Sequence, residues 1–140
     1  MNAMLANEWT VLVAGEHTAG QFAIVEARVR PGSEPPRHMH SREDEFICVL
    51  EGRVTFDRDG ERLDGPSGTW LYLPRGCEHT FAVESVEARL LVMFSPAGLE
   101  GCLRESGQPG DPVAEDEVIE RLVATAARYG VAITGPGGKP

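Results

Sequence analysis

The sequence is poor in basic residues and contains no long hydrophobic run, and both shortages exclude classes of protein. Its 140 residues include 13 Lys and Arg against 22 Asp and Glu, which gives a formal net charge of −9. Because nucleic-acid phosphates would be repelled by such a surface, we expect no nucleic-acid partner. No segment approaches the roughly 18 consecutive apolar residues of a membrane-spanning helix, so we expect no membrane partner. A Gly-x-Ser-x-Gly motif is also absent, which leaves serine-based hydrolysis without support.

Cysteines are few, and their arrangement favours reduced thiols. Cys48, Cys77 and Cys102 are odd in number and have no Cys-x-x-Cys spacing. We expect Cys48 to fill core space on a strand and Cys77 to be a turn residue near His79. The N-terminal stretch lacks the basic region and apolar segment of a secretory signal, so the expected location is cytoplasmic.

Most of the chain has the two-residue period of β-strands. Residues 21–30 alternate between apolar and charged side chains, whereas residues 46–50 are apolar on both faces, as in a strand buried between two layers. Asp59-Gly60 predicts a tight hairpin, and residues 69–73 and 89–94 predict later strands. Short strands separated by turns every eight to twelve residues indicate an all-β sandwich or barrel.

The C-terminal part has a different pattern. Residues 118–129 place apolar side chains at helical spacing, and Gly130 suits the position just after a helix. We therefore expect residues 1–106 to form the barrel with its N-terminal strands. Residues 107–140 are expected to add a linker, a C-terminal helix and a frayed tail to the same domain. No internal repeat is present, so one barrel is expected.

Three histidines and a glutamate form the most informative group in the sequence. His38 and His40 are two residues apart, so on a strand both imidazoles point to the same face. Glu45 follows closely, and His79 comes from a separate segment after a Pro-Arg-Gly turn. Imidazole nitrogens with a carboxylate suit a divalent transition metal, and Fe, Mn, Ni, Cu and Zn all remain candidates. The fourth histidine, His17, is expected to be a loop residue.

The spacing around these residues resembles the two motifs of the cupin family. Gly32-SEPPR-His38-Met-His40-SRED-Glu45-FICVLE-Gly52 matches G(X)5HXH(X)3,4E(X)6G. Gly68-TWLYL-Pro74-Arg-Gly76-CE-His79 matches G(X)5PXG(X)2H(X)3N up to its last position, where Val83 replaces Asn. The resemblance implies a single jelly-roll β-barrel, with His38, His40, Glu45 and His79 as ligands of one metal. It also implies a homodimer.

The carboxylate ligand and the pocket walls are assigned less directly. Glu45 shares its strand face with Ile47 and Val49, and Glu43 is the reserve ligand. Phe81 shares a face with His79. The expected strand at residues 69–73 contributes either Leu71 and Leu73 or Trp70 and Tyr72. The predicted substrate pocket is therefore Ile47, Val49, Leu71, Leu73 and Phe81.

Resemblance to small cupins likened to quercetin 2,3-dioxygenase implies an oxidoreductase that acts on a small enol- or flavonol-like molecule. Glu45 would then be both a metal ligand and a catalytic base. Two alternatives remain open. One is an isomerase, cyclase or lyase that uses the metal without O2, and the other is a small-molecule-binding protein without activity, because one fold hosts many chemistries.

Overall fold

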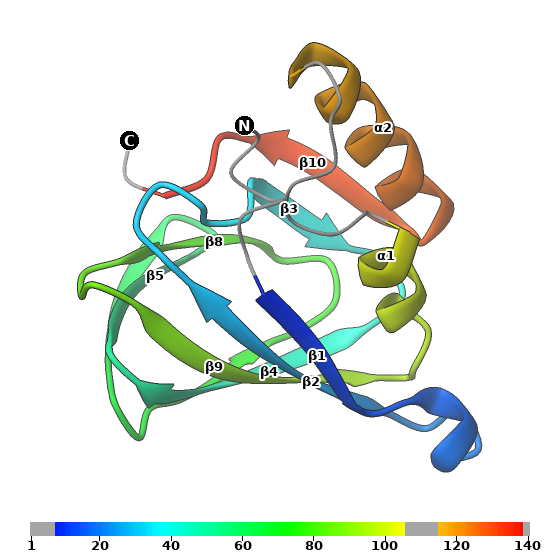
Figure 1. The fold of residues 1–140 in the computed structure, drawn as a ribbon, viewed down its shortest axis with the longest axis horizontal. Coiled ribbons are helices and arrows are strands. Elements are labelled where there is room, and N and C mark those ends of the chain that lie inside the picture. The colour runs from blue at the N-terminus through cyan, green and yellow to red at the C-terminus, as the bar shows by residue number, and fades with distance from the viewer. Residues whose placement is uncertain (1–7, 106–114, 139–140) are drawn as a thin grey trace.

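The computed structural model describes residues 8–105 and 115–138, with only the backbone for 115–119, and has two facing antiparallel sheets (Figure 1). One sheet has the order β1-β2-β9-β4-β7, and the other has the order β10-β3-β8-β5-β6. The first contains β1 (Glu8–Val13), β2 (Ala23–Val29), β9 (Ala88–Ser95), β4 (Asp44–Glu51) and β7 (Trp70–Leu73). The second contains β10 (Val131–Gly135), β3 (Arg37–His40), β8 (Glu78–Val83), β5 (Arg53–Arg58) and β6 (Glu61–Pro66). The all-β jelly-roll prediction is confirmed.

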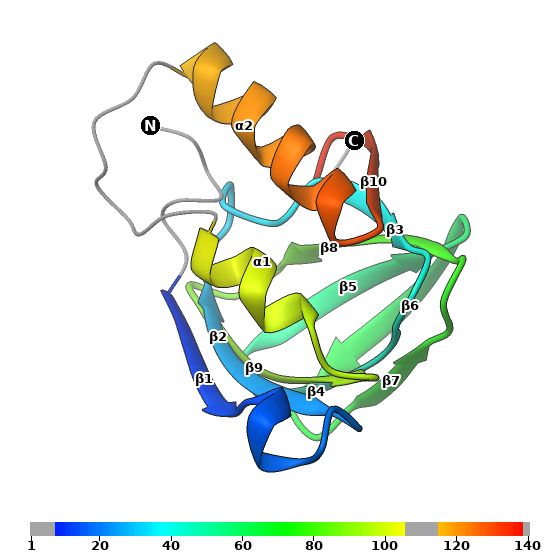
Figure 2. The same cartoon turned by 90° about the vertical axis from the view of Figure 1, so that its right-hand side faces the viewer.

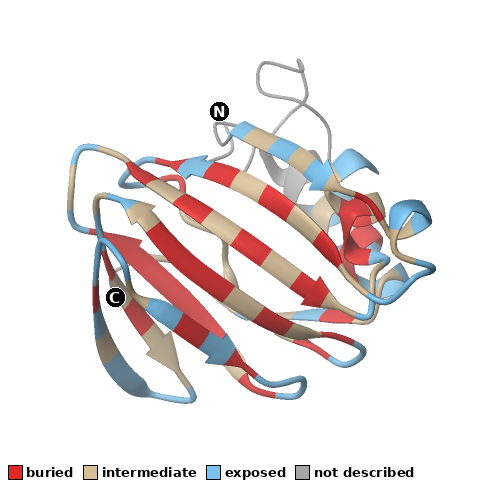
Figure 3. Cartoon of the chain, turned by 90° about the horizontal axis from the view of Figure 1, so that it is seen from below, coloured by how far each residue is buried: buried red, intermediate tan, exposed pale blue. Residues whose placement is uncertain are grey.

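The strands alternate between buried and more exposed residues because one face of each sheet packs against the other sheet (Figure 3). In β9, every second side chain is buried along the whole strand. Phe56, Leu73 and Leu90 are among the largest fully buried side chains, and they fill the space between the sheets. Val83, which occupies the motif's Asn position, is also buried in this core.

Turns occur where the sequence predicts them. Asp59 and Gly60 both have positive φ, 51° and 87°, as the tight hairpin between β5 and β6 requires. Gly52 follows β4 with φ of 89°, and an added Cβ there would lie 2.5 Å from the Glu87 carbonyl oxygen. This position therefore requires glycine for both conformation and space.

Two helices pack on one side of the barrel, α1 (Leu99–Glu105) and α2 (Glu115–Arg128) (Figure 2). Of the predicted apolar stripe on α2, Ala126 is buried, Leu122 and Tyr129 are partly buried, and Val123 is 45% exposed. The side chains of the remaining two, residues 118 and 119, lie outside the described part of the chain. Neither helix, as far as the structure describes them, has the length and apolar character needed to cross a bilayer.

The C-terminal helix is confirmed, and Gly130 follows it with φ of 75° as predicted. The short helix α1 and the strand β10 were not anticipated. β10 pairs with β3, with Val131 opposite His40 and Ile133 opposite His38. The segment after α2 is thus an edge strand that lies directly beside the strand carrying two of the candidate ligands.

Candidate metal centre

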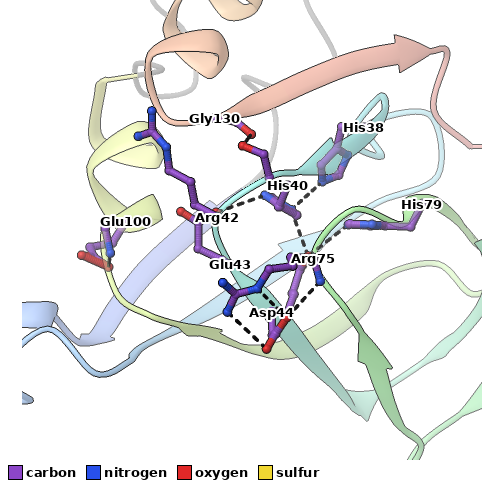
Figure 4. A network of polar contacts seen from close by, with 12 residues as sticks. His38, His40, Arg42, Glu43, Asp44, Arg75, His79, Glu100 and Gly130 are labelled. Carbon is purple, nitrogen blue, oxygen red and sulfur yellow. Dashed lines mark hydrogen bonds and ion pairs between the residues drawn. The ribbon is translucent and has the colours of Figure 1, made fainter.

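The four candidate residues converge from both sheets. β3 carries His38 and His40, and β8 places His79 opposite His38 in the antiparallel ladder. Glu45 comes from β4 in the other sheet. Three of the four, His40, Glu45 and His79, are buried, and the four ligand atoms all lie within 4.8 Å of one another. Figure 4 shows the three imidazoles turned toward one another.

The separations of the ligand atoms fit a single metal ion. His40 Nε2 lies 3.1 Å from both His38 Nε2 and Glu45 Oε2, and His79 Nε2 lies 3.0 Å from Glu45 Oε2. Two ligands about 2.1 Å from one metal and at right angles would be about 3.0 Å apart. Although close, Glu45 Oε2 and His79 Nε2 have no partner in acceptable hydrogen-bond geometry, and both atoms are buried. Buried polar atoms seldom lack partners, so their convergence is compatible with one metal ion held among them.

Two of the imidazoles are oriented by backbone carbonyls. His38 Nδ1 lies 2.6 Å from the Pro36 carbonyl oxygen, and His79 Nδ1 lies 3.3 Å from the Cys77 carbonyl oxygen. Because a carbonyl can only accept, each Nδ1 must carry the proton and donate it. The lone pair is therefore on Nε2, the atom that points into the cluster, as a metal ligand requires.

The electrostatics of His38 and Glu45 favour the protonation states that bind metal. Burial, together with repulsion from the charged forms of His79 and His40, lowers the pKa of His38 to about 3. Burial alone would raise the pKa of Glu45, but contacts with His40 and His79 hold it below its usual range. Burial lowers the pKa of His40, yet the Glu45 carboxylate outweighs this and the net shift is upward. A neutral His38 beside an ionised Glu45 is a donor set for a cation.

The acidic run at the start of β4 separates into three different environments. Glu45 lies among the three Nε2 atoms, and Asp44 forms an ion pair with Arg75. Glu43 is buried on the other side of the His40 ring, with Oε2 4.0 Å from Nδ1. Of the two carboxylates that the sequence left open, Glu45 is therefore the one beside all the Nε2 atoms, and Glu43 is not in the cluster.

A largely apolar cavity opens from the cluster toward the helices. Ile47 and Phe81 line it, whereas Val49, Leu71 and Leu73 are buried in the core without lining it. Those three are packed within the hydrophobic core, and Trp70 and Tyr72 are exposed on the outer face of β7. Leu71 and Leu73 therefore point inward from β7 but are packed in the core. Their part in substrate binding stays a prediction.

Several cavity walls were not predicted from the sequence. They lie on three elements: Trp9 on β1, Leu99 and Leu103 on α1, and Val131 and Ile133 on β10. The stripe on α2 was recognised, and its Leu122 and Ala126 do line the cavity. The two missed elements are short, five and seven residues, and offer no clear period. No lysine or arginine is among the described residues that line the cavity.

Comparisons with known proteins agree with this architecture. The chain is 31% identical over 123 residues to a quercetin 2,3-dioxygenase of Bacillus subtilis, covering 84% of this chain and 36% of that protein. Across the curated relatives it matches, the chain spans 36% to 64% of their length. The structure of KdgF from Halomonas sp. has a TM-score of 0.62 at 17% identity, over 68% of this chain and 83% of that one.

A cupin-superfamily sugar phosphate isomerase from Silicibacter pomeroyi has a TM-score of 0.57 at 28% identity, over 66% of this chain and 61% of that one. Residues 25–94 match the Cupin domain family, and this range contains all four clustered residues. With half of its length matched and both motifs in place, the chain belongs to the cupin family.

Proposed function

We propose that this protein is a metal-dependent oxidoreductase of the dioxygenase type that acts on a small enol- or flavonol-like molecule. One observation carries the proposal: the three imidazoles and Glu45 face an apolar cavity that has no cationic side chain among its described walls. A pocket with apolar walls and a few convergent polar groups suits a small organic substrate. The likeness to the Bacillus subtilis quercetin 2,3-dioxygenase supports the same substrate class.

His38, His40, Glu45 and His79 would hold one divalent metal, with Fe, Mn, Ni, Cu or Zn as the candidates. When bound, such a metal supplies Lewis acidity and a binding position for an anionic substrate oxygen. The remaining roles belong to side chains of the protein. Ile47 and Phe81 contact the apolar body of the substrate and exclude water from it.

Glu45 is proposed as the catalytic base as well as a ligand. Its Oε2 is buried and has no hydrogen-bond partner in acceptable geometry. An acidic substrate hydroxyl that enters the cluster would meet this oxygen and transfer its proton to it. The substrate anion formed in this step would then carry the negative charge that Glu45 has lost.

The same cluster also suits an isomerase, cyclase or lyase that needs no O2, or a binding protein without activity. The sugar phosphate isomerase among the structural relatives supports the first alternative. However, phosphate groups are usually bound by Arg, Lys or helix N-termini, and no Arg or Lys lines the described cavity. This favours the oxidoreductase. We further propose that the protein is a cytoplasmic homodimer with a small molecule as its partner.

The test is metal reconstitution followed by O2 uptake. Protein loaded separately with each of the five metals is assayed with a panel of enediols and flavonols, with His79→Ala as the control that lacks a ligand. We expect O2 uptake with at least one metal and none with His79→Ala. Glu45→Gln retains an oxygen ligand, so it should lose about 10²–10⁴-fold in turnover and less in metal affinity.

Two results would contradict the proposal in different ways. If the wild-type protein retains none of the five metals after desalting, the metal site itself is wrong. If it retains metal but consumes no O2 while converting an enediol to an isomer, the isomerase alternative replaces the oxidoreductase.

A further inference from the structure

Glu43 is a buried acid that the proposed chemistry does not use. It lies in the turn between β3 and β4, and its side chain is only 5% exposed. Its Oε2 has no hydrogen-bond partner, although an unpaired buried carboxylate is costly. The adjacent cation does not neutralise it by direct contact, since the Arg42 guanidinium donates to the Arg128 carbonyl oxygen instead. A buried carboxylate of this kind is expected to have a hydrogen-bond donor nearby.

His40 Nδ1 is the matching atom. It too is buried without a hydrogen-bond partner, and it faces Glu43 Oε2 at 4.0 Å. The Nδ1 atoms of His38 and His79 already have backbone carbonyls as acceptors. His40 is therefore the one imidazole of the cluster whose outer nitrogen has no acceptor within hydrogen-bond distance. Figure 4 shows Glu43 on the side of His40 away from the other imidazoles.

We propose that Glu43 is a positioning residue that accepts a hydrogen bond from His40 Nδ1–H and thereby directs Nε2 into the cluster. A small rotation of the Glu43 side chain closes the present separation to hydrogen-bond length. The bond fixes the Nδ1–H tautomer, orients the ring and increases its basicity toward a metal. This role rests on the proposed metal function for its purpose, but the hydrogen bond itself does not require a metal.

The neighbouring acid provides a matched control. Asp44 is adjacent to Glu43 and has the same charge, but its carboxylate accepts from the Arg75 backbone N–H and side chain and does not contact His40. Asp44→Asn therefore removes an equal charge at nearly the same place without touching the imidazole. Glu43→Gln removes the charge but keeps an oxygen acceptor, and Glu43→Ala removes both.

The first readout is the exchange rate of the His40 Nδ1 proton in the full-length, metal-free protein, from NMR at a pH where the ring carries a proton on both nitrogens. Acceptors near Nε2 then do not compete for the proton on Nδ1. We expect slow exchange in the wild type, in Asp44→Asn and in Glu43→Gln, and fast exchange in Glu43→Ala. If Glu43→Ala does not fold, fast exchange in the wild type would still overturn the proposal, and slow exchange in the wild type and in Glu43→Gln would support it.

The second readout is Zn²⁺ affinity, measured by competition with a chelator. Loss of a group that orients a ligand costs about 10–100-fold in affinity, so we expect that loss in Glu43→Ala, a smaller loss in Glu43→Gln and none in Asp44→Asn. Equal affinity in Glu43→Ala and Asp44→Asn would refute the positioning role. A wild type whose His40 Nδ1 proton exchanges slowly but which retains no metal would contradict the proposed function and leave the Glu43 contact standing.

Discussion

We predict that the metal affinity of the cluster depends on β10, a strand that pairs with β3 but contributes none of the four clustered residues. On its other side, β3 pairs with β8 at only two positions, His38 with His79 and Met39 with Glu78. β10 pairs with the same stretch at Val131, Ala132 and Ile133 before the register shifts. Three of the five strand pairings of the His38–His40 segment are thus with β10.

Ala132→Pro tests this dependence through the backbone alone. Ala132 is exposed, so replacing its side chain removes little packing. The Ser41 amide donates to the Gly130 carbonyl oxygen, and hydrogen-bonded pairs in an antiparallel ladder recur every second residue. Ala132 therefore faces Met39 in a hydrogen-bonded pair, and proline removes its donor.

Leaving the Met39 carbonyl oxygen unpaired costs about 1–3 kcal/mol. If this cost falls on the geometry that binds metal, the affinity for Zn²⁺ should decrease by about 5- to 150-fold. Competition with a chelator measures the change, and hydrogen exchange of the Met39 amide reports the loosened pairing. Ala132→Thr is the control, because it keeps the donor and favours a strand. An unchanged Zn²⁺ affinity in a folded Ala132→Pro protein would refute the argument.

Three further predictions follow from the packing. Phe56→Ala removes a side chain that is 2% exposed and lies edge-on to Phe81, so urea unfolding should show a loss of about 3–5 kcal/mol. Gly52→Ala should lower the melting temperature far more than Gly60→Ala, because both have positive φ but only at Gly52 would a Cβ meet backbone. Light scattering at tens of micromolar should give the mass of a dimer, and a monomer mass would contradict the homodimer.

The candidate site could be predicted from the sequence because its residues lie at fixed spacings on strands. The interval between His38 and His40 places both rings on one face, and the spacing to Gly52 favoured Glu45 over Glu43. The buried location of Glu43 beside His40 was not predictable, because a turn follows neither the strand nor the helix period. Its position depends on how the turn folds back over the ring.

The residues that line the cavity were harder to predict from the sequence than the candidate ligands. Parity groups residues by face, which left Leu71 with Leu73 and Trp70 with Tyr72 as alternatives. It also does not say which inward residues border an open space. That depends on which segments, remote from one another in sequence, meet around the space. Trp9 and Ile133, for example, both line the cavity. β10 itself is a five-residue strand with one Ala and one Gly, and it is defined by its partner rather than by its own pattern.

The long separation between β3 and β10 also sets the order in which the site is assembled during synthesis. His79, the last of the four clustered residues, is made about fifty residues before Val131. At roughly 5–20 residues per second, the interval is about three to ten seconds. During that time the four residues have neither their edge strand nor the α2 helix that lines the cavity. We expect metal ions to reach the imidazoles more easily in this interval than after α2 and β10 have packed.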